Sequence, residues 1–338
     1  MKFVSFQYQD KDHLGFSIDG KVYDVHKCGV KLNLNLPDNM KDFLNQQESI
    51  IHDVKKLHDS IAHSPKDFVI VQDPILLSPV PHPTSVRDGY AFRQHVQTMR
   101  KNRGAEMAPE FDQFPIFYYS NHNATFGPGE VLLEKDHFVR MDYELEVSVV
   151  IGKRGINIPV DKADDYIFGY MIWNDLSARC LQMEEMKLSL GPAKGKDFAN
   201  TFGPYLVTKD ELVNKKINTP EGEKYDLVMK ARHNGTQVSE GNMKTMDWTF
   251  AQIIERASYG TELLPGDIIG SGTVGTGCYA EINSTATRKA EAEGVTYTPT
   301  WLEPGDTIEL EIEGLGTLTN TLTLRNPNYS ILAKKKNI

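Results

Sequence analysis

The chain has 338 residues, 40% of them hydrophobic, which is enough to bury a sizeable core in one large domain or two smaller ones. A formal net charge of −9 argues against nucleic acid or an anionic membrane as a main partner. No apolar run approaches the roughly 18 to 20 residues that a membrane span needs. The N-terminus lacks a signal-peptide pattern, so we expect a cytoplasmic protein.

Residues 1–80 are predicted to form a small N-terminal module. Three strand patterns open it, "KFVSFQYQ", "HLGFSID" and "KVYDV", and Asp19-Gly20 between the last two is a hairpin signal. Apolar residues at helical spacing then predict a helix over 37–63. The proline-dense stretch "DPILLSPVPHPTS" follows and favours a boundary. We therefore expect a second, larger domain over 81–338.

Strands dominate the larger domain. It is predicted to open with a helix over 85–104, with Ser85 as a possible cap and Gly104 as a possible stop. Two more helices are expected in "LSARCLQMEEMKL" and "DWTFAQIIERAS". Most of the remaining segments read as strands, among them "DDYIFGYMIWND", "GPYLVTK" and "TIELEIEGLGTLTNTLTL". The predicted fold class is mainly β with some α, a mixed β-sandwich or roll rather than alternating strands and helices.

The segment "MDYELEVSVVIG" places three acids at the start of a buried strand. Asp142, Glu144 and Glu146 are two residues apart, and side chains at that spacing share one face of a strand. Carboxylates so close together repel unless a positive charge lies among them. One interpretation is a site for Mg²⁺, Ca²⁺ or Mn²⁺, and the other is a solvated acidic face.

Two further segments carry residues of the same chemical kinds. Asp175 ends an apolar strand just ahead of a helix, where it would also serve as an N-cap. Asp88 and His95 in "RDGYAFRQH" are seven residues apart, about two turns, and would share a face of the expected helix. An isolated histidine on a helix usually has no special role.

Together these segments resemble the fumarylacetoacetate hydrolase family. The similarity is visible, in family order, in "DYELEVSVVIG", "GYMIWNDLSARCLQ", "LGPAKGKDFANTFGPYLV", "LLPGDIIGSGTVGTG" and "GDTIELEIEGLGTLTNTL". "RDGYAFRQH" resembles the segment that carries the catalytic histidine in fumarylacetoacetases. The resemblance also implies that the N-terminal module is a small SH3-like barrel and that the protein is a homodimer.

The resemblance implies a role for each matching position. Asp88, Glu144, Glu146 and Asp175 would be the metal ligands, and Asp142 would support the strand instead. His95 would be the general base, oriented by Glu281, with Lys196 and Arg179 as catalytic cations. The residues expected to bind substrate are Tyr90, Tyr118, Gln182 and Thr273.

Several positions depart from the family pattern. Cys180 stands where another acid is usual, and Met186 replaces an aromatic residue of the pocket. Arg100 and Arg103 lie near, but not at, the position of an expected arginine. The segment "FYYSNHN" around Tyr118 lacks glycine. These departures leave the core chemistry in place and bear on the identity of the substrate.

The implied activity is divalent-metal-dependent hydrolysis of a C–C bond in a 1,3-dioxo carboxylate of the fumarylacetoacetate or acylpyruvate type. The cofactor would be Mg²⁺ or Ca²⁺, or else Mn²⁺, which stabilises the departing enolate. The same scaffold would also serve an oxaloacetate decarboxylase, a hydratase or an isomerase. A catalytically silent Ca²⁺-binding homologue is a further alternative.

The glycine-rich stretch "GSGTVG" over 270–275 fits the G-x-G-x-x-G pattern of dinucleotide-binding folds. That fingerprint requires a βαβ unit whose second strand ends in an acid about 20 residues on. The residues between 282 and 306 contain no pattern for such a strand. We therefore interpret the glycines as a tight turn at the edge of the site.

Overall fold

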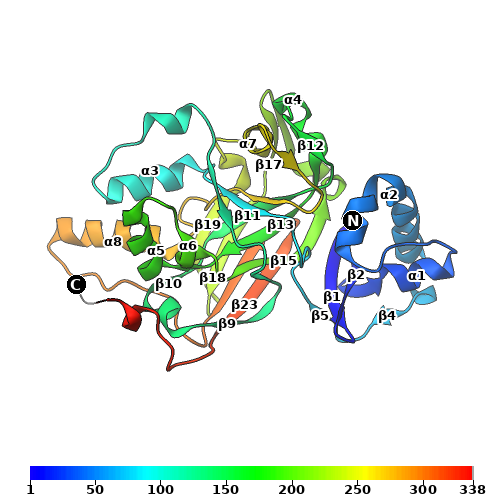
Figure 1. Cartoon of the computed structure of the whole chain (residues 1–338), viewed down its shortest axis with the longest axis horizontal. Coiled ribbons are helices and arrows are strands. Elements are labelled where there is room, and N and C mark those ends of the chain that lie inside the picture. The colour runs from blue at the N-terminus through cyan, green and yellow to red at the C-terminus, as the bar shows by residue number, and fades with distance from the viewer. Residues whose placement is uncertain (337–338) are drawn as a thin grey trace.

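The computed structural model describes residues 1–336 and has a mixed α/β architecture built on two large sheets (Figure 1). The larger sheet has twelve strands, ten of them in the order β4-β3-β2-β1-β15-β13-β11-β21-β6-β7, with β5 on β1 and β8 on β15. Their bounds are β1 Lys2–Tyr8, β2 Lys11–Ile18, β3 Lys21–Asp24, β4 Ile70–Val71, β5 Ile75–Leu76, β6 Val86–Gly89, β7 Phe117–Ser120, β8 Thr125–Phe126, β11 Leu145–Ile151, β13 Ile167–Asp175, β15 Asn200–Thr208 and β21 Ile268–Gly270.

The second large sheet has five strands in the order β19-β18-β22-β23-β9. Their bounds are β9 Gly129–Leu133, β18 Val228–His233, β19 Thr236–Asn242, β22 Thr307–Ile312 and β23 Gly316–Leu324. Three two-stranded sheets complete the strands: β10 Met141–Asp142 with β14 Ser177–Ala178, β12 Gly155–Ile156 with β20 Glu262–Leu263, and β16 Lys216–Thr219 with β17 Gly222–Tyr225.

The helices lie around the sheets rather than alternating with their strands (Figure 1). Their bounds are α1 Val25–Lys31, α2 Met40–His63, α3 Arg93–Asn102, α4 Val160–Ala163, α5 Arg179–Glu185, α6 Ala193–Lys196, α7 Phe250–Ser258 and α8 Tyr279–Glu293. Within residues 1–336, no helix has both the length and the hydropathy that crossing a bilayer requires.

One hydrophobic core joins the two large sheets. It includes Val147 and Tyr170 from the larger sheet together with Met229, Leu310 and Leu318 from the five-stranded sheet, all with 1% exposure or less. Strand β11 is buried at every residue and pairs with β13 on one side and β21 on the other. The predicted mixed, largely β fold is therefore confirmed, and its central strands hold the side chains of the site in fixed positions.

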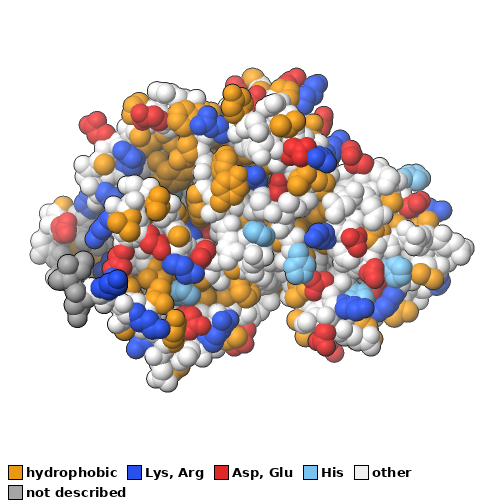
Figure 2. Space-filling model, viewed as in Figure 1, with side chains coloured by type: hydrophobic (Ala, Val, Ile, Leu, Met, Phe, Trp, Pro, Cys, Tyr) orange, Lys and Arg blue, Asp and Glu red, His pale blue; other side chains and the backbone are white. Residues whose placement is uncertain are grey.

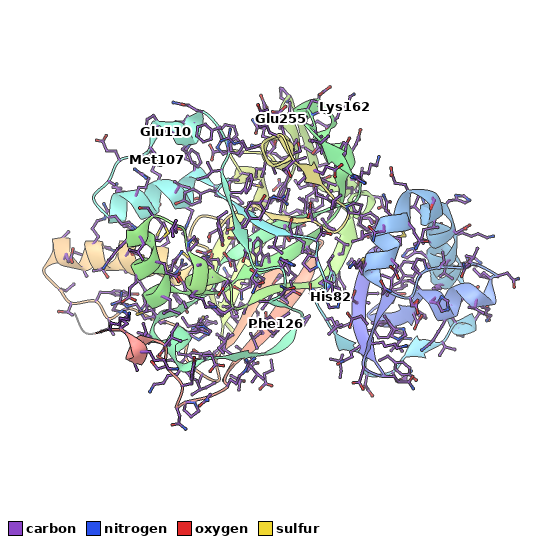
Figure 3. The ribbon with its side chains drawn as sticks, viewed as in Figure 1. His82, Met107, Glu110, Phe126, Lys162 and Glu255 are labelled. Carbon is purple, nitrogen blue, oxygen red and sulfur yellow. The ribbon has the colours of Figure 1, made fainter. Side chains whose placement is uncertain are left out.

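The N-terminal segment is hydrogen-bonded to the rest of the chain through β1, which pairs antiparallel with β15. The hairpin predicted at Asp19-Gly20 and the long helix predicted over 37–63 are both present, as β2–β3 and α2. Figure 3 labels His82 where the chain leaves this segment and Phe126 near the same junction. A second core links Phe3 and Phe43 here to Phe202 of β15. The SH3-like character and the boundary at residue 80 stay predictions.

The helix predicted over 85–104 is wrong in its first part. Val86–Gly89 is strand β6, fully buried, parallel to β21 and antiparallel to β7. Strand pairing overrides local helical preference here, and α3 begins only at Arg93. A Cβ on Gly89 would lie 2.8 Å from the carbonyl oxygen of Gly270, so the close approach of β6 to β21 requires glycine. Asp88 and His95 therefore belong to different elements and do not share a helix face.

The sequence predicts no helix where α8 lies. This helix follows the glycine-rich turn, begins directly after Cys278 and carries Glu281 in its first turn. The helices predicted in "LSARCLQMEEMKL" and "DWTFAQIIERAS" are present as α5 and α7. No βαβ unit follows α8 among the described residues, because the next strand, β22, belongs to the antiparallel part of the other sheet.

Candidate active site

A cavity of about 310 Å³ lies where β6, β7, α3, α5 and the 270–275 turn meet. Its walls combine charged groups with apolar side chains, the arrangement typical of a small-molecule site. Nine of the twelve residues predicted for the site line it directly: Asp88, Tyr90, His95, Tyr118, Glu144, Arg179, Gln182, Lys196 and Thr273. The other three, Glu146, Asp175 and Glu281, lie directly behind these walls.

Four carboxylates converge on the floor of the cavity. Asp88, Glu144, Glu146 and Asp175 each place an oxygen within 4.8 Å of the others, and all four are buried. They come from β6, from the residue before β11, from β11 and from the end of β13. Adjacent positions in the sheet thus bring together acids that are far apart in the sequence.

Two buried cations lie beside these acids. The Lys196 ammonium donates to Glu144 and to Asp175, at 2.5 Å in the second case. The Arg179 guanidinium donates to Glu144 Oε1 at 2.7 Å and to Asp142 Oδ2 at 2.8 Å. A buried charge is tolerated only when it is paired and hydrogen-bonded, and Glu144 fulfils this condition with both cations.

The carboxyl groups differ in their electrostatic environment. Burial opposes ionisation of Glu144, but Lys196 and Arg179 hold its pKa well below the usual range. Burial and the charge of Asp175 raise the pKa of Asp88 to about 8. Burial and the charge of Asp88 likewise raise the pKa of Glu146 well above its usual value. The side of the cluster away from the cations is therefore short of positive charge.

The Asp142 carboxylate lies at the start of helix α8, whereas the sequence predicts that it supports the strand. Its two carboxylate oxygens accept from the backbone N–H groups of Tyr279 at 2.7 Å and Ala280 at 2.9 Å, in the first turn of α8. Unpaired N–H groups and the positive end of the helix dipole favour a carboxylate there. Because Asp142 also binds Arg179, it connects the start of α8 to the cations of the site.

Three acids two residues apart thus project toward the same side, as their alternation predicts, although the strand is interrupted between Asp142 and Leu145. Glu144 at this interruption is oriented by Asn174, whose side-chain oxygen accepts from the Glu144 backbone N–H at 3.1 Å. The solvated-face interpretation is wrong, because Asp142 and Glu146 are 0% exposed and Glu144 is 5% exposed.

His95 and Glu281 form a buried pair at the side of the cavity. His95 Nδ1 lies 2.6 Å from Glu281 Oε2, and the same carboxylate oxygen accepts from the Thr276 backbone N–H at 3.0 Å. Glu281 stands in the first turn of α8, three residues after Cys278, the residue before the helix. A carboxylate on Nδ1 selects the tautomer in which the other ring nitrogen, Nε2, is free to accept a proton.

The glycine-rich turn brings backbone into contact with the carboxylates. Gly272, with φ of +78°, donates its N–H to Asp88 Oδ1 at 3.0 Å. A Cβ on Gly270 would lie 2.2 Å from the Trp173 ring and 2.7 Å from Asp88 Oδ1. Thr273 Oγ1 donates to Glu146 Oε1 at 3.4 Å. The stretch is a tight turn that supports the acids, in agreement with our interpretation of the sequence.

Other residues predicted for the site contact its charged groups. Tyr118 donates to Asp175 Oδ2 at 2.5 Å, and Gln182 accepts from Arg179 at 2.9 Å. Tyr90 stands between two rings, with its centroid 6.2 Å from that of His95 and 6.4 Å from that of Phe111. The structure thus brings all twelve residues together, while their individual roles stay predictions.

Sequence reasoning missed part of the wall. The residues in question are Met99, Ile116, Phe117, Gly191 and Pro192. Of the two arginines considered after His95, Arg103 lines the cavity, whereas Arg100 bonds to the carbonyl of Glu106. The spacing from His95 along α3 was a signal for Arg103. The loop residues carried none, because only the tertiary fold brings them to the cavity.

The carboxylate cluster fits a divalent cation. Glu146 Oε2 and Asp175 Oδ1 are buried and have no hydrogen-bond partner among residues 1–336. Buried polar atoms are nearly always paired, so two such oxygens directed into one cluster indicate a missing positive partner. Oxygen-only ligands suit a hard cation such as Mg²⁺, Ca²⁺ or Mn²⁺.

Residues 84–323 match the family model described as fumarylacetoacetate (FAA) hydrolase C-terminal. The chain belongs to the fumarylacetoacetate hydrolase family. An uncharacterized protein of Staphylococcus haemolyticus is 31% identical over 331 residues, which cover 94% of this chain and 98% of that protein.

Two solved structures extend the likeness within the fumarylacetoacetate hydrolase family. A fumarylacetoacetate hydrolase from Exiguobacterium antarcticum is 24% identical, with a TM-score of 0.65 over 96% of this chain and all of that one. Maleylpyruvate hydrolase from Sphingobium, solved with manganese(II) and pyruvate, is 20% identical, with a TM-score of 0.65 over the same shares. At these identities the two structures show a common fold.

Proposed function

We propose that the protein is a divalent-metal-dependent hydrolase that cleaves a C–C bond of a 1,3-dioxo carboxylate, of the fumarylacetoacetate or acylpyruvate type. The observation that carries the proposal is the His95–Glu281 pair, 2.6 Å apart, in the wall of the cavity whose floor holds the four carboxylates. A base and a cation-binding group in one cavity are what hydrolysis of such a substrate requires.

His95 would act on water. With Nδ1 bound to Glu281, Nε2 accepts the proton as water attacks the carbonyl carbon, and the carboxylate stabilises the imidazolium that forms. The same histidine then returns a proton to the departing enolate carbon. Burial of the pair, at 5% exposure for His95 and 2% for Glu281, keeps bulk water from competing for these protons.

The buried cations would stabilise negative charge. A cation bound by Asp88, Glu144, Glu146 and Asp175 would supply Lewis-acid polarisation of substrate oxygens. Lys196 and Arg179 are held in place by Glu144, so no reorganisation is needed when charge develops nearby. Loss of one such preorganised group typically costs about 10²–10³ in rate. Tyr90 and Tyr118 have hydroxyl groups suited to the substrate oxygens.

The test is the loss of enol absorbance of fumarylacetoacetate, fumarylpyruvate, acetylpyruvate and oxaloacetate, each measured with Mg²⁺ and with excess chelator. We expect metal-dependent cleavage of a dioxo acid, and its loss in Glu144→Ala. Turnover of oxaloacetate alone would favour the decarboxylase. A Glu144→Ala protein that retains full activity and full metal content would contradict the proposal.

A decarboxylase, hydratase or isomerase stays the second candidate, because a stabilised enolate serves each of these reactions. The retained His95–Glu281 pair favours hydrolysis, since decarboxylation needs no base to activate water. If the protein is a silent Ca²⁺-binding homologue, the wild type binds metal but turns over none of these substrates. His95→Asn would then leave its metal content unchanged.

A further inference from the structure

A second, smaller cavity lies beside the active-site cavity. Its volume is about 130 Å³, and most of its wall is apolar: Val96, Ala108, Phe111, Phe114, Ile116 and Trp248. Tyr90 and Ile116 line both cavities. We call this smaller cavity the side chamber. Because these two side chains belong to the walls of both, the side chamber adjoins the active-site cavity at Tyr90 and Ile116.

The side chamber is bounded by the segment from Arg103 to Ile116, which forms an arch above α3 in Figure 1. Figure 3 labels Met107 and Glu110 on this arch, and Figure 2 shows hydrophobic side chains gathered on the same part of the surface. The arch leads directly from α3, which carries His95, to β7, which carries Tyr118. Its position thus depends on the two elements that form the site.

Several contacts hold the arch in place. Trp248 Nε1 donates to the Phe111 carbonyl oxygen at 2.9 Å, and Arg93 forms ion pairs with Asp112 and with Asp247. The Arg256 guanidinium lies 4.6 Å from the centroid of the Phe114 ring. The side chamber is therefore bounded by residues anchored to α3 and α7, and it is not a gap beneath a free loop.

The side chamber is apolar apart from two side chains of opposite charge. These are Arg100, whose guanidinium donates to the Glu106 carbonyl oxygen, and the exposed Glu110. An uncharged hydrocarbon group that enters the side chamber would exchange water for apolar walls, which is favourable by about 0.8 kcal/mol per methylene.

We propose that the side chamber is a binding subsite for the hydrocarbon substituent of the substrate's acyl group. This rests on the proposed function and narrows it: the preferred substrate is an acylpyruvate with a short, uncharged alkyl chain. The volume of the side chamber, about 130 Å³, is enough for a propyl group.

The experiment compares 2,4-dioxo acids that carry methyl or propyl on the acyl carbonyl. Two buried methylenes should raise kcat/KM for the propyl compound about fifteenfold over acetylpyruvate, at about fourfold per methylene. Ala108→Leu fills the side chamber and should reduce this preference to twofold or less. Ala105→Leu, the same change at an exposed position outside both cavities, should retain the full preference of about fifteenfold.

A binding measurement separates this inference from the proposed function. Dissociation constants of the methyl and propyl compounds are measured by calorimetry with Mg²⁺ in His95→Asn, with and without Ala108→Leu. Tighter binding of the propyl compound that disappears with Ala108→Leu supports the subsite even if no dioxo acid is cleaved by wild type. Equal affinities, or no binding of either compound, overturn the subsite even if acetylpyruvate is cleaved.

Discussion

The imidazole of His95 and the carboxylate of Glu281 lie 2.6 Å apart although 186 residues separate them in the sequence. Helices α3 and α8 pack against each other, and this contact holds the pair. A buried carboxylate bound to Nδ1 orients the ring and favours its protonated form during reaction. The pair therefore behaves as one acid–base unit, and its two members should be tested separately.

Replacement of His95 by Asn should lower kcat about 10²–10⁴-fold, the usual contribution of a general base. Glu281→Gln should also lower kcat, because the amide no longer selects the productive tautomer. Metal content by atomic emission should stay at the wild-type level in both variants, since neither residue belongs to the carboxylate cluster. His52→Gln, an exposed histidine on α2, is the matched control. Wild-type kcat in His95→Asn would refute the role of this base.

Glu146→Gln should weaken metal binding and at the same time stabilise the metal-free protein. The Glu146 carboxylate is 0% exposed, lacks a cationic partner among residues 1–336 and lies next to other acids. An amide removes this unfavourable charge, for an expected gain of about 1–3 kcal/mol. Melting temperatures with chelator and with Mg²⁺ measure both effects. Glu303→Gln, at an exposed turn, should change neither value. A lower melting temperature in chelator would contradict the prediction.

Lys196→Met should destabilise the protein in chelator by about 3–5 kcal/mol, because Glu144 and Asp175 lose a buried cation that both contact. Saturating Mg²⁺ should recover part of this loss, since the metal brings positive charge to the same carboxylates. Urea unfolding in the two conditions provides the comparison. Lys194→Met, two positions before Lys196, removes an exposed ion pair with Asp197 and should cost at most about 1 kcal/mol. If Lys196→Met lowers the free energy of unfolding equally with and without Mg²⁺, the metal and Lys196 do not act on the same carboxylates.

His137 should make the protein acid-sensitive. Burial, followed by the charge of Lys194, lowers the pKa of His137 from 6.5 to about 4. Its ring stacks on Phe198 with centroids 4.0 Å apart, and Nδ1 accepts from the Glu134 backbone N–H at 3.2 Å, which requires a neutral ring. In the unfolded chain the ring takes up a proton below about pH 6.5, so stability present above this pH is lost as pH falls toward 4.

The measurement is the free energy of unfolding of wild type and His137→Gln at pH 7.5 and pH 5. Glutamine can still accept from the Glu134 N–H but does not titrate. On the order of 2 kcal/mol of the wild-type loss between these pH values should be absent in the variant. If wild type and His137→Gln lose the same free energy of unfolding between pH 7.5 and pH 5, the acid sensitivity comes from a group other than His137.

Motifs in the sequence were sufficient to predict the site, and the local structure around it was harder to predict. Glu144, Glu146 and Asp175 were identified because they border strongly apolar strands with a clear period. Asp88 was identified but assigned to a helix, since its pairing with Gly270 is a contact between residues 182 positions apart. Helix α8 was missed because few of its residues are buried, and its apolar periodicity is correspondingly weak. The side chamber depends on loop packing, which no local pattern encodes.

The pairing of β1 with β15 has a consequence for how the chain can be divided. Strand β15 reaches the site through Asn200, and its other edge is occupied by β1. A fragment that begins at residue 81 would leave this edge open and uncover Phe202 and Leu206. An open strand edge beside exposed apolar side chains can pair with a strand of another chain. Such a fragment should therefore aggregate unless the first 80 residues are supplied as a separate polypeptide, which makes complementation by co-expression a route to split versions of this protein.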